Sequence, residues 1–147
     1  MRSGPASMLA PIRVFLVCSF SILRAGLQRL LAGRHRLALV GEAAGLADIP
    51  RLTPAPDIFL IEPARDNPAC LTDLPVLLAR YPSSRAMLLV RQCKKEWEGW
   101  GLRMGIAGVV GAEEPPATLV QAIRQVHAGQ IWLSPATVAD TLGQLAG

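Results

Sequence analysis

Cysteine, histidine and long apolar runs are all scarce in this chain of 147 residues. The three cysteines form no CxxC pair or zinc-ligand spacing, and an odd number argues against the disulfide framework of a secreted protein. No apolar run approaches the roughly eighteen residues of a membrane span. Residues 1–11 contain one arginine and lack the apolar core of a signal peptide, so we expect a flexible tail there. These absences predict a cytoplasmic protein that does not bind a membrane.

Catalytic groups are also missing. His35 and His127 are isolated along the chain and are interpreted as surface residues. No nucleophile and base occur at a useful spacing, so the sequence predicts a protein that is not an enzyme and that has no metal site and no cofactor.

The chain is basic, with a net charge of +4 and a sequence pI near 9.5. The arginines are scattered without a dense stripe or interleaved aromatic residues, which favours solvated faces over a nucleic-acid site in this segment. They include Arg24, Arg29, Arg34, Arg36, Arg80, Arg85 and Arg124.

An apolar content of 51% over 147 residues is enough for one compact domain and too little chain for two. Near-continuous apolar runs, typical of parallel strands buried on both faces, alternate with helical patterns. The strands are expected at 13–17, 37–40, 58–61, 87–90 and 108–110, and the helices at 22–31, 71–80, 96–104 and 118–128. Pro50 interrupts the segment 46–52, so the second helix should be short or irregular. The pattern predicts an α/β fold, a doubly wound five-stranded parallel sheet with flanking helices.

Short motifs follow these elements in order between residues 12 and 135. They are IRVFLV at 12–17, ILRAGL at 22–27, VGEA at 40–43, PDIFLI at 56–61, MGIAGVV at 104–110, LVQAIR at 119–124, AG at 128–129 and WLSP at 132–135. Together they resemble the receiver domain of NarL/LuxR-type two-component response regulators. The resemblance implies a CheY-like or flavodoxin-like domain at 12–133 and the start of an interdomain linker at 134–147. In that family a helix-turn-helix DNA-binding domain usually follows, and we expect none within this chain.

The resemblance also implies five positions for phosphorylation chemistry, and each has an unsuitable residue. Cys18 and Ser19 replace the acidic pair that binds Mg²⁺, although this hard cation prefers carboxylate oxygens. Glu62 replaces the aspartate nucleophile, and its extra methylene moves the carboxylate away from the attacking position. Val90 replaces the switch Ser/Thr and Ala112 replaces the lysine. We therefore expect an atypical receiver that does not form an aspartyl phosphate.

The alternative is a slipped register in which Asp57, Asp66 or Asp48 is the phosphoacceptor. Asp57 precedes its strand and would lie at the wrong end, because sites in parallel α/β sheets form at the carboxyl ends of the strands. In the favoured register, Glu62 should either reach water or pair with a cation such as Arg65 or Arg91. Cys18, Cys70 and Cys93 would follow strands on that same edge; a thiol sensor is conceivable, but unrelated reduced cysteines are favoured.

Trp97 and Trp100 are three residues apart on an expected helix and so share one face. With Leu119 and Ile123 of the last helix they form a candidate interaction surface. We expect a homodimer that regulates transcription through protein contacts, with DNA bound only by a domain outside this chain. The alternatives are a pseudo-receiver that binds a small molecule in the emptied acidic pocket and a stand-alone protein-interaction module; either a small molecule or a protein would then be the regulator.

Overall fold

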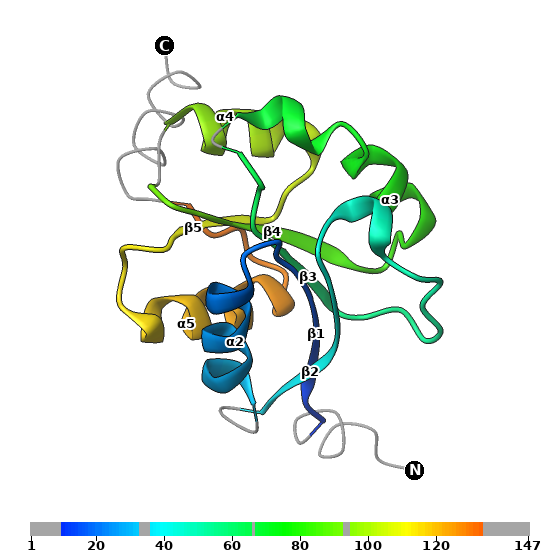
Figure 1. Cartoon of the computed structure of the whole chain (residues 1–147), viewed down its shortest axis with the longest axis vertical. Coiled ribbons are helices and arrows are strands. Elements are labelled where there is room, and N and C mark those ends of the chain that lie inside the picture. Colours follow the sequence, from blue (N-terminus) through cyan, green and yellow to red (C-terminus); the bar gives the residue numbers. More distant parts are fainter. Residues whose placement is uncertain (1–9, 33–35, 66, 93–94, 134–147) are drawn as a thin grey trace.

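The computed structural model describes residues 10–32, 36–65, 67–92 and 95–133. The strands in these ranges form one five-stranded parallel sheet (Figure 1). The strand order β2-β1-β3-β4-β5 places β1 inside the sheet, with β2 and β5 at its edges. The strands are β1 (Ile12–Val17), β2 (Leu37–Ala43), β3 (Ile58–Ile61), β4 (Arg85–Val90) and β5 (Gly108–Gly111). The predicted fold class is confirmed.

Helices cover both faces of this sheet (Figure 1). The helices α2 (Ser21–Leu31) and α5 (Pro116–His127) lie on one face, and α3 (Leu74–Arg80) and α4 (Lys95–Met104) lie on the other. Successive side chains of a strand point to opposite faces. In β1, Val14 and Leu16 therefore join the core under α2 and α5, whereas Phe15 and Val17 join the core under α3 and α4. Two covered faces explain why the strands appear in the sequence as continuous apolar runs.

Two helices differ in extent. The predicted helix at 71–80 begins at Leu74, because Pro75 has no amide proton and is tolerated only in the first turn. A 3₁₀ turn, η2 (Pro68–Leu71), precedes it and is capped by the Asn67 side chain, which accepts a hydrogen bond from the Ala69 amide at 3.0 Å. The expected short second helix is a single 3₁₀ turn, η1 (Leu46–Asp48).

The register of β1 against β2 shifts by one residue between Val14 and Phe15. Val14 pairs with Leu39, but Phe15 pairs with Gly41, so Val40 is an extra residue in β2. Val40 is consequently 40% exposed although it lies within a strand. The shift brings the Phe15 ring directly against the Cα side of Gly41.

Several predicted features lie outside the described residues: positions 1–9 of the tail, the linker at 134–147, His35, Asp66 and Cys93. Across the ranges that are described, no helix combines the length and the apolar character needed to cross a membrane.

Candidate functional site

The strand ends gather the predicted site positions at the carboxyl edge of the sheet. Cys18 directly follows β1, Glu62 directly follows β3, and Ala112 directly follows β5. Ladder hydrogen bonds continue through them: the Glu62 amide donates to the Val17 carbonyl at 2.8 Å, and the Ala112 amide donates to the Val90 carbonyl at 2.6 Å. The sheet register therefore brings together positions that are separated by up to 94 residues in the numbering of the chain.

Glu62 is buried at this edge, with only 8% of its surface exposed. The Cys18 thiol donates to its carboxylate with Sγ 3.7 Å from Oε1, and the Ser19 backbone provides a second hydrogen bond. Burial raises the pKa of Glu62 above its ordinary value, although the Cys18 thiol and the positive charge of Arg91 act in the opposite direction. The expectation of a solvated carboxylate is wrong. Of the two expected cations, Arg91 acts on Glu62 electrostatically, and a thiol supplies the side-chain hydrogen bond.

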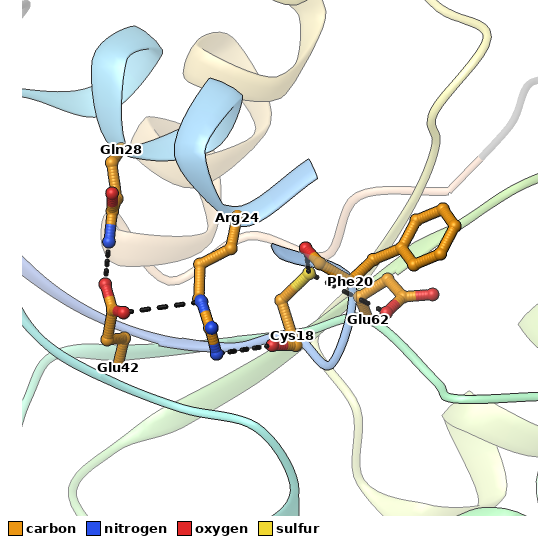
Figure 2. Close-up of polar contacts among 6 residues, drawn as sticks. All are labelled: Cys18, Phe20, Arg24, Gln28, Glu42 and Glu62. Atoms are coloured by element: carbon orange, nitrogen blue, oxygen red, sulfur yellow. Dashed lines mark hydrogen bonds and ion pairs between the residues drawn. The ribbon is translucent and has the colours of Figure 1, made fainter. Parts of the chain in front are cut away.

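Cys18 is completely buried beside Glu62. Burial raises the pKa of its thiol, and the negative charge of Glu62 raises it further. The thiol also lies 3.5 Å from the Phe20 carbonyl oxygen, so it contacts two acceptors (Figure 2). A protonated, enclosed thiol reacts slowly, because the thiolate is the nucleophilic form. Cys18 is thus a hydrogen-bond donor here and a poor candidate for a redox sensor.

Arg24 connects α2 to the same edge from the other side of β1 (Figure 2). Its Nε lies 3.3 Å from the Glu42 carboxylate, and its NH1 donates to the Cys18 carbonyl at 3.2 Å. The Gln28 side chain, one turn further along α2, also donates to Glu42. Both partners of the ion pair are partly exposed, so the bridge orients α2 more than it stabilises the fold.

Comparisons with known proteins agree with this architecture, although no protein-family model matches the chain. It is 28% identical over 138 residues to the DNA-binding transcriptional activator DevR/DosR of Mycobacterium tuberculosis, covering 92% of this chain and 64% of that protein. A LuxR-family two-component response regulator from Aurantimonas superposes with a TM-score of 0.72 at 22% identity, covering 94% of this chain and 100% of the other. A structure of two RcsB dimers bound to two parallel DNAs superposes with a TM-score of 0.71 at 17% identity, covering 88% of this chain and 67% of that one. This chain matches the receiver domain of LuxR-family response regulators. It spans less than two thirds of the length of DevR/DosR.

The other receiver positions differ in their exposure. Val90, at the end of β4, is 3% exposed and belongs to the core under α3 and α4. Ser19, after β1, and Ala112, after β5, are both exposed. In the order of the strands across the sheet, they lie on opposite sides of β4. In the part of the receiver domain that the structure describes, no three His, Cys, Asp or Glu side chains come together as a metal site would require.

The slipped register is incompatible with the position of Asp57. Its carboxylate accepts a hydrogen bond from the Arg13 amide at 2.8 Å, and its carbonyl accepts one from the Arg85 amide at 3.0 Å. Both contacts lie at the amino end of the sheet, opposite the edge that contains Glu62. Asp48 is exposed in η1, after the edge strand β2. Neither aspartate therefore occupies the phosphoacceptor position of the receiver fold.

A small pocket of about 110 Å³ opens at the carboxyl edge beside Glu62. The loops after β3 and β4 contribute most of its lining, and α4 contributes one ring. The lining residues are Pro63, Ala64, Arg65, Val90, Arg91 and Trp97. The sequence identified Arg65 and Arg91 only as partners for Glu62; that two loops would bring both arginines to one pocket follows from the fold.

The predicted interaction surface needs a correction. Trp97 is 2% exposed, Leu119 4% and Ile123 0%, so these three side chains lie within the core of this chain. Leu119 and Ile123 are four residues apart on α5 and share its core-facing stripe. Only Trp100 is half-buried, with its ring packed edge-on against Trp97 at 6.1 Å between centroids. The largest exposed apolar side chains lie elsewhere: Phe20, Ile22, Val40, Val76 and Ile131.

Proposed function

We propose that this receiver domain acts without aspartyl phosphorylation, as the regulatory part of a transcription regulator that works through protein contacts. The observation that carries the proposal is the pair formed by Cys18 and Glu62. A receiver that uses phosphate needs a solvent-accessible carboxylate next to a bound divalent cation. Here Glu62 is a buried residue, 8% exposed, and its carboxylate is hydrogen-bonded to a thiol.

Two further properties of the edge support this proposal. The pKa of Glu62 is raised by burial, so the ionised form that attacks a phosphodonor is disfavoured. Val90 offers no hydroxyl and Ala112 no ammonium group to stabilise a phosphoryl oxygen. The proposed role is therefore non-enzymatic. DNA binding would belong to a domain outside this chain, because DevR/DosR is a DNA-binding activator and is longer than this chain.

Intact-mass measurement tests the proposal directly. The domain incubated with acetyl phosphate and Mg²⁺ should keep its mass, because the nucleophile is buried and the cation has too few oxygen ligands. The matched control restores the missing groups with C18D, S19D, E62D, V90T and A112K together, and should gain one phosphoryl group. A stable adduct on Glu62 of the unmodified chain would overturn the proposal.

A second candidate function is binding of a small-molecule regulator, which is favoured by the pocket lined by Arg65 and Arg91. In this version the ligand would take over the switching role of the phosphoryl group. Ligand that binds only the native state raises the melting temperature, so a thermal-shift screen separates this candidate from regulation by protein contact alone.

A further inference from the structure

The pocket at the carboxyl edge differs in charge from what an acidic receiver site would present. Arg65, in the loop after β3, and Arg91, directly after β4, both line it and are both exposed at its mouth. Glu62 is not among its lining residues, and its carboxylate is engaged by the Cys18 thiol. Among the described lining residues, the charged side chains are thus two guanidinium groups.

The walls complement these cations. Trp97 and Val90 are 2% and 3% exposed and provide an apolar floor, with Pro63 and Ala64 beside them. Arg91 is additionally positioned by the Phe20 ring, whose centroid lies 5.6 Å from its Cζ. A guanidinium held over an aromatic ring loses less freedom when it binds an anion, because part of its motion is already restricted.

The size of the pocket limits the ligand. A volume of about 110 Å³ corresponds to a few water molecules, each of which occupies about 30 Å³ of liquid. A neighbouring hollow of about 230 Å³ is lined by Arg65, Asn67, Ala69 and Cys70, so Arg65 lies between the two spaces. A compact anionic group fits the first space, and a longer polar ligand would extend into the second.

We propose that this pocket reversibly binds a small oxyanion, a phosphoryl or carboxylate group, through Arg65 and Arg91 and without a divalent cation. The inference rests on the second candidate function and names its ligand class. Guanidinium groups bind both kinds of oxyanion through paired, charge-assisted hydrogen bonds. The charges would therefore be the reverse of those in an acidic receiver pocket, because the protein supplies the cations and the ligand supplies the negative charge.

The experiment is a titration of the ¹⁵N-labelled domain with inorganic phosphate or succinate, at constant ionic strength maintained with chloride and in the presence of EDTA. We expect saturable shifts of the Trp97 indole N–H resonance, because that ring lines the pocket. Arg65→Gln and Arg91→Gln should each weaken binding about tenfold, the usual effect of losing one charge-assisted hydrogen bond. Arg91→Lys should recover only part of the affinity, because it restores the charge without the planar fork.

The matched control is Arg80→Gln, which removes an exposed arginine at the end of α3 and leaves the pocket unchanged. Binding of phosphate alone or of succinate alone supports the proposal and identifies the preferred group. Unchanged Trp97 signals with both anions, or equal weakening by Arg80→Gln and Arg65→Gln, would overturn it. Either of these results leaves the outcome of the acetyl phosphate mass measurement unchanged. Conversely, a phosphoryl adduct in that measurement would refute regulation without phosphorylation, but it would not exclude an anion site that depends on the two arginines.

Discussion

The position of Glu62 in the fold follows from the sequence pattern, but its hydrogen bonds do not. A strand of four apolar residues followed by a glutamate predicts that the glutamate stands at the carboxyl edge, and it does. The direction of its side chain depends on the Cys18 thiol and the Ser19 backbone, which come from 44 and 43 positions earlier in the chain. Local sequence contains no information on such a contact, so water and arginine were the natural expected partners. The positions of the site were therefore predictable, and the hydrogen bonds within it were not.

The burial of Glu62 predicts a pH-dependent effect of Glu62→Gln. Because the pKa of Glu62 is raised in the folded state, its favourable contribution is complete below the ordinary carboxyl pKa and is lost as the pH rises through the raised value. Glutamine is neutral at every pH and still offers an oxygen to the Cys18 thiol. Urea unfolding should therefore show the variant gaining stability relative to the original chain between pH 4 and pH 8, by on the order of 1 kcal/mol.

The exposed Glu96→Gln is the control for the loss of one carboxylate elsewhere. If the stability difference between Glu62→Gln and the original chain were the same at both pH values, burial would not govern the ionisation of Glu62.

At the scale of elements, periodicity and turn residues predicted the strands and most helix ends. The stop at Gly129 is an example, since its φ of 100° is the left-handed conformation that glycine adopts readily. Pairing between strands was less accessible. The expected second strand ended at Val40, whereas β2 continues to Ala43, because a bulge restores its pairing with β1 after the extra residue. A register shift depends on how two strands pair, so it produces no periodic pattern in the residues of either strand that could predict it.

Two glycine-to-alanine substitutions, one beside the bulge and one within α2, should change stability in opposite directions. A Cβ added at Gly41 would lie 2.7 Å from the Phe15 ring, which is itself packed against Phe59 at 5.8 Å between centroids. Gly41→Ala should therefore lower the free energy of unfolding by about 1 to 3 kcal/mol. Gly26 lies within α2 with nothing within 4 Å of the added Cβ, so Gly26→Ala should raise it by about 1 kcal/mol. Denaturant unfolding of both variants measures the two effects, and a destabilised Gly26→Ala would contradict the open surroundings of that position.

For the whole molecule, the two faces of the sheet differ in what they expose. Ile22 is 85% exposed at the start of α2, one turn before Gly26, which lines an apolar hollow of about 220 Å³ between α2 and α5. Val76, 59% exposed on α3, lies on the opposite side of the sheet. On α4, Trp97 is buried and Trp100 is half-buried, so this helix offers a smaller exposed aromatic surface than expected. A two-fold interface, the commonest arrangement in soluble homo-oligomers, is therefore better supplied from the side of α2.

We predict that the domain dimerises at micromolar concentration without a phosphodonor and that acetyl phosphate leaves the equilibrium unchanged. Ile22→Ser should weaken the dimer several-fold, because it removes an exposed apolar side chain from the α2 side of the domain. Val76→Ser, a matched loss of an exposed apolar side chain, should have no effect. Sedimentation equilibrium distinguishes these outcomes, and a monomer at high concentration would favour regulation by a ligand over regulation by self-association.

The contact between the Cys18 thiol and the Glu62 carboxylate also bears on the folding landscape. Clustered carboxylates are a local source of frustration, since like charges repel in the folded state until a cation relieves them. At this edge the Glu62 carboxylate is held by a thiol donor and a backbone hydrogen bond, so local chemistry and global fold agree there. A bistable element needs such a conflict to drive its transition. Under the proposed function, we therefore expect any switching at this edge to depend on a molecule that binds from outside.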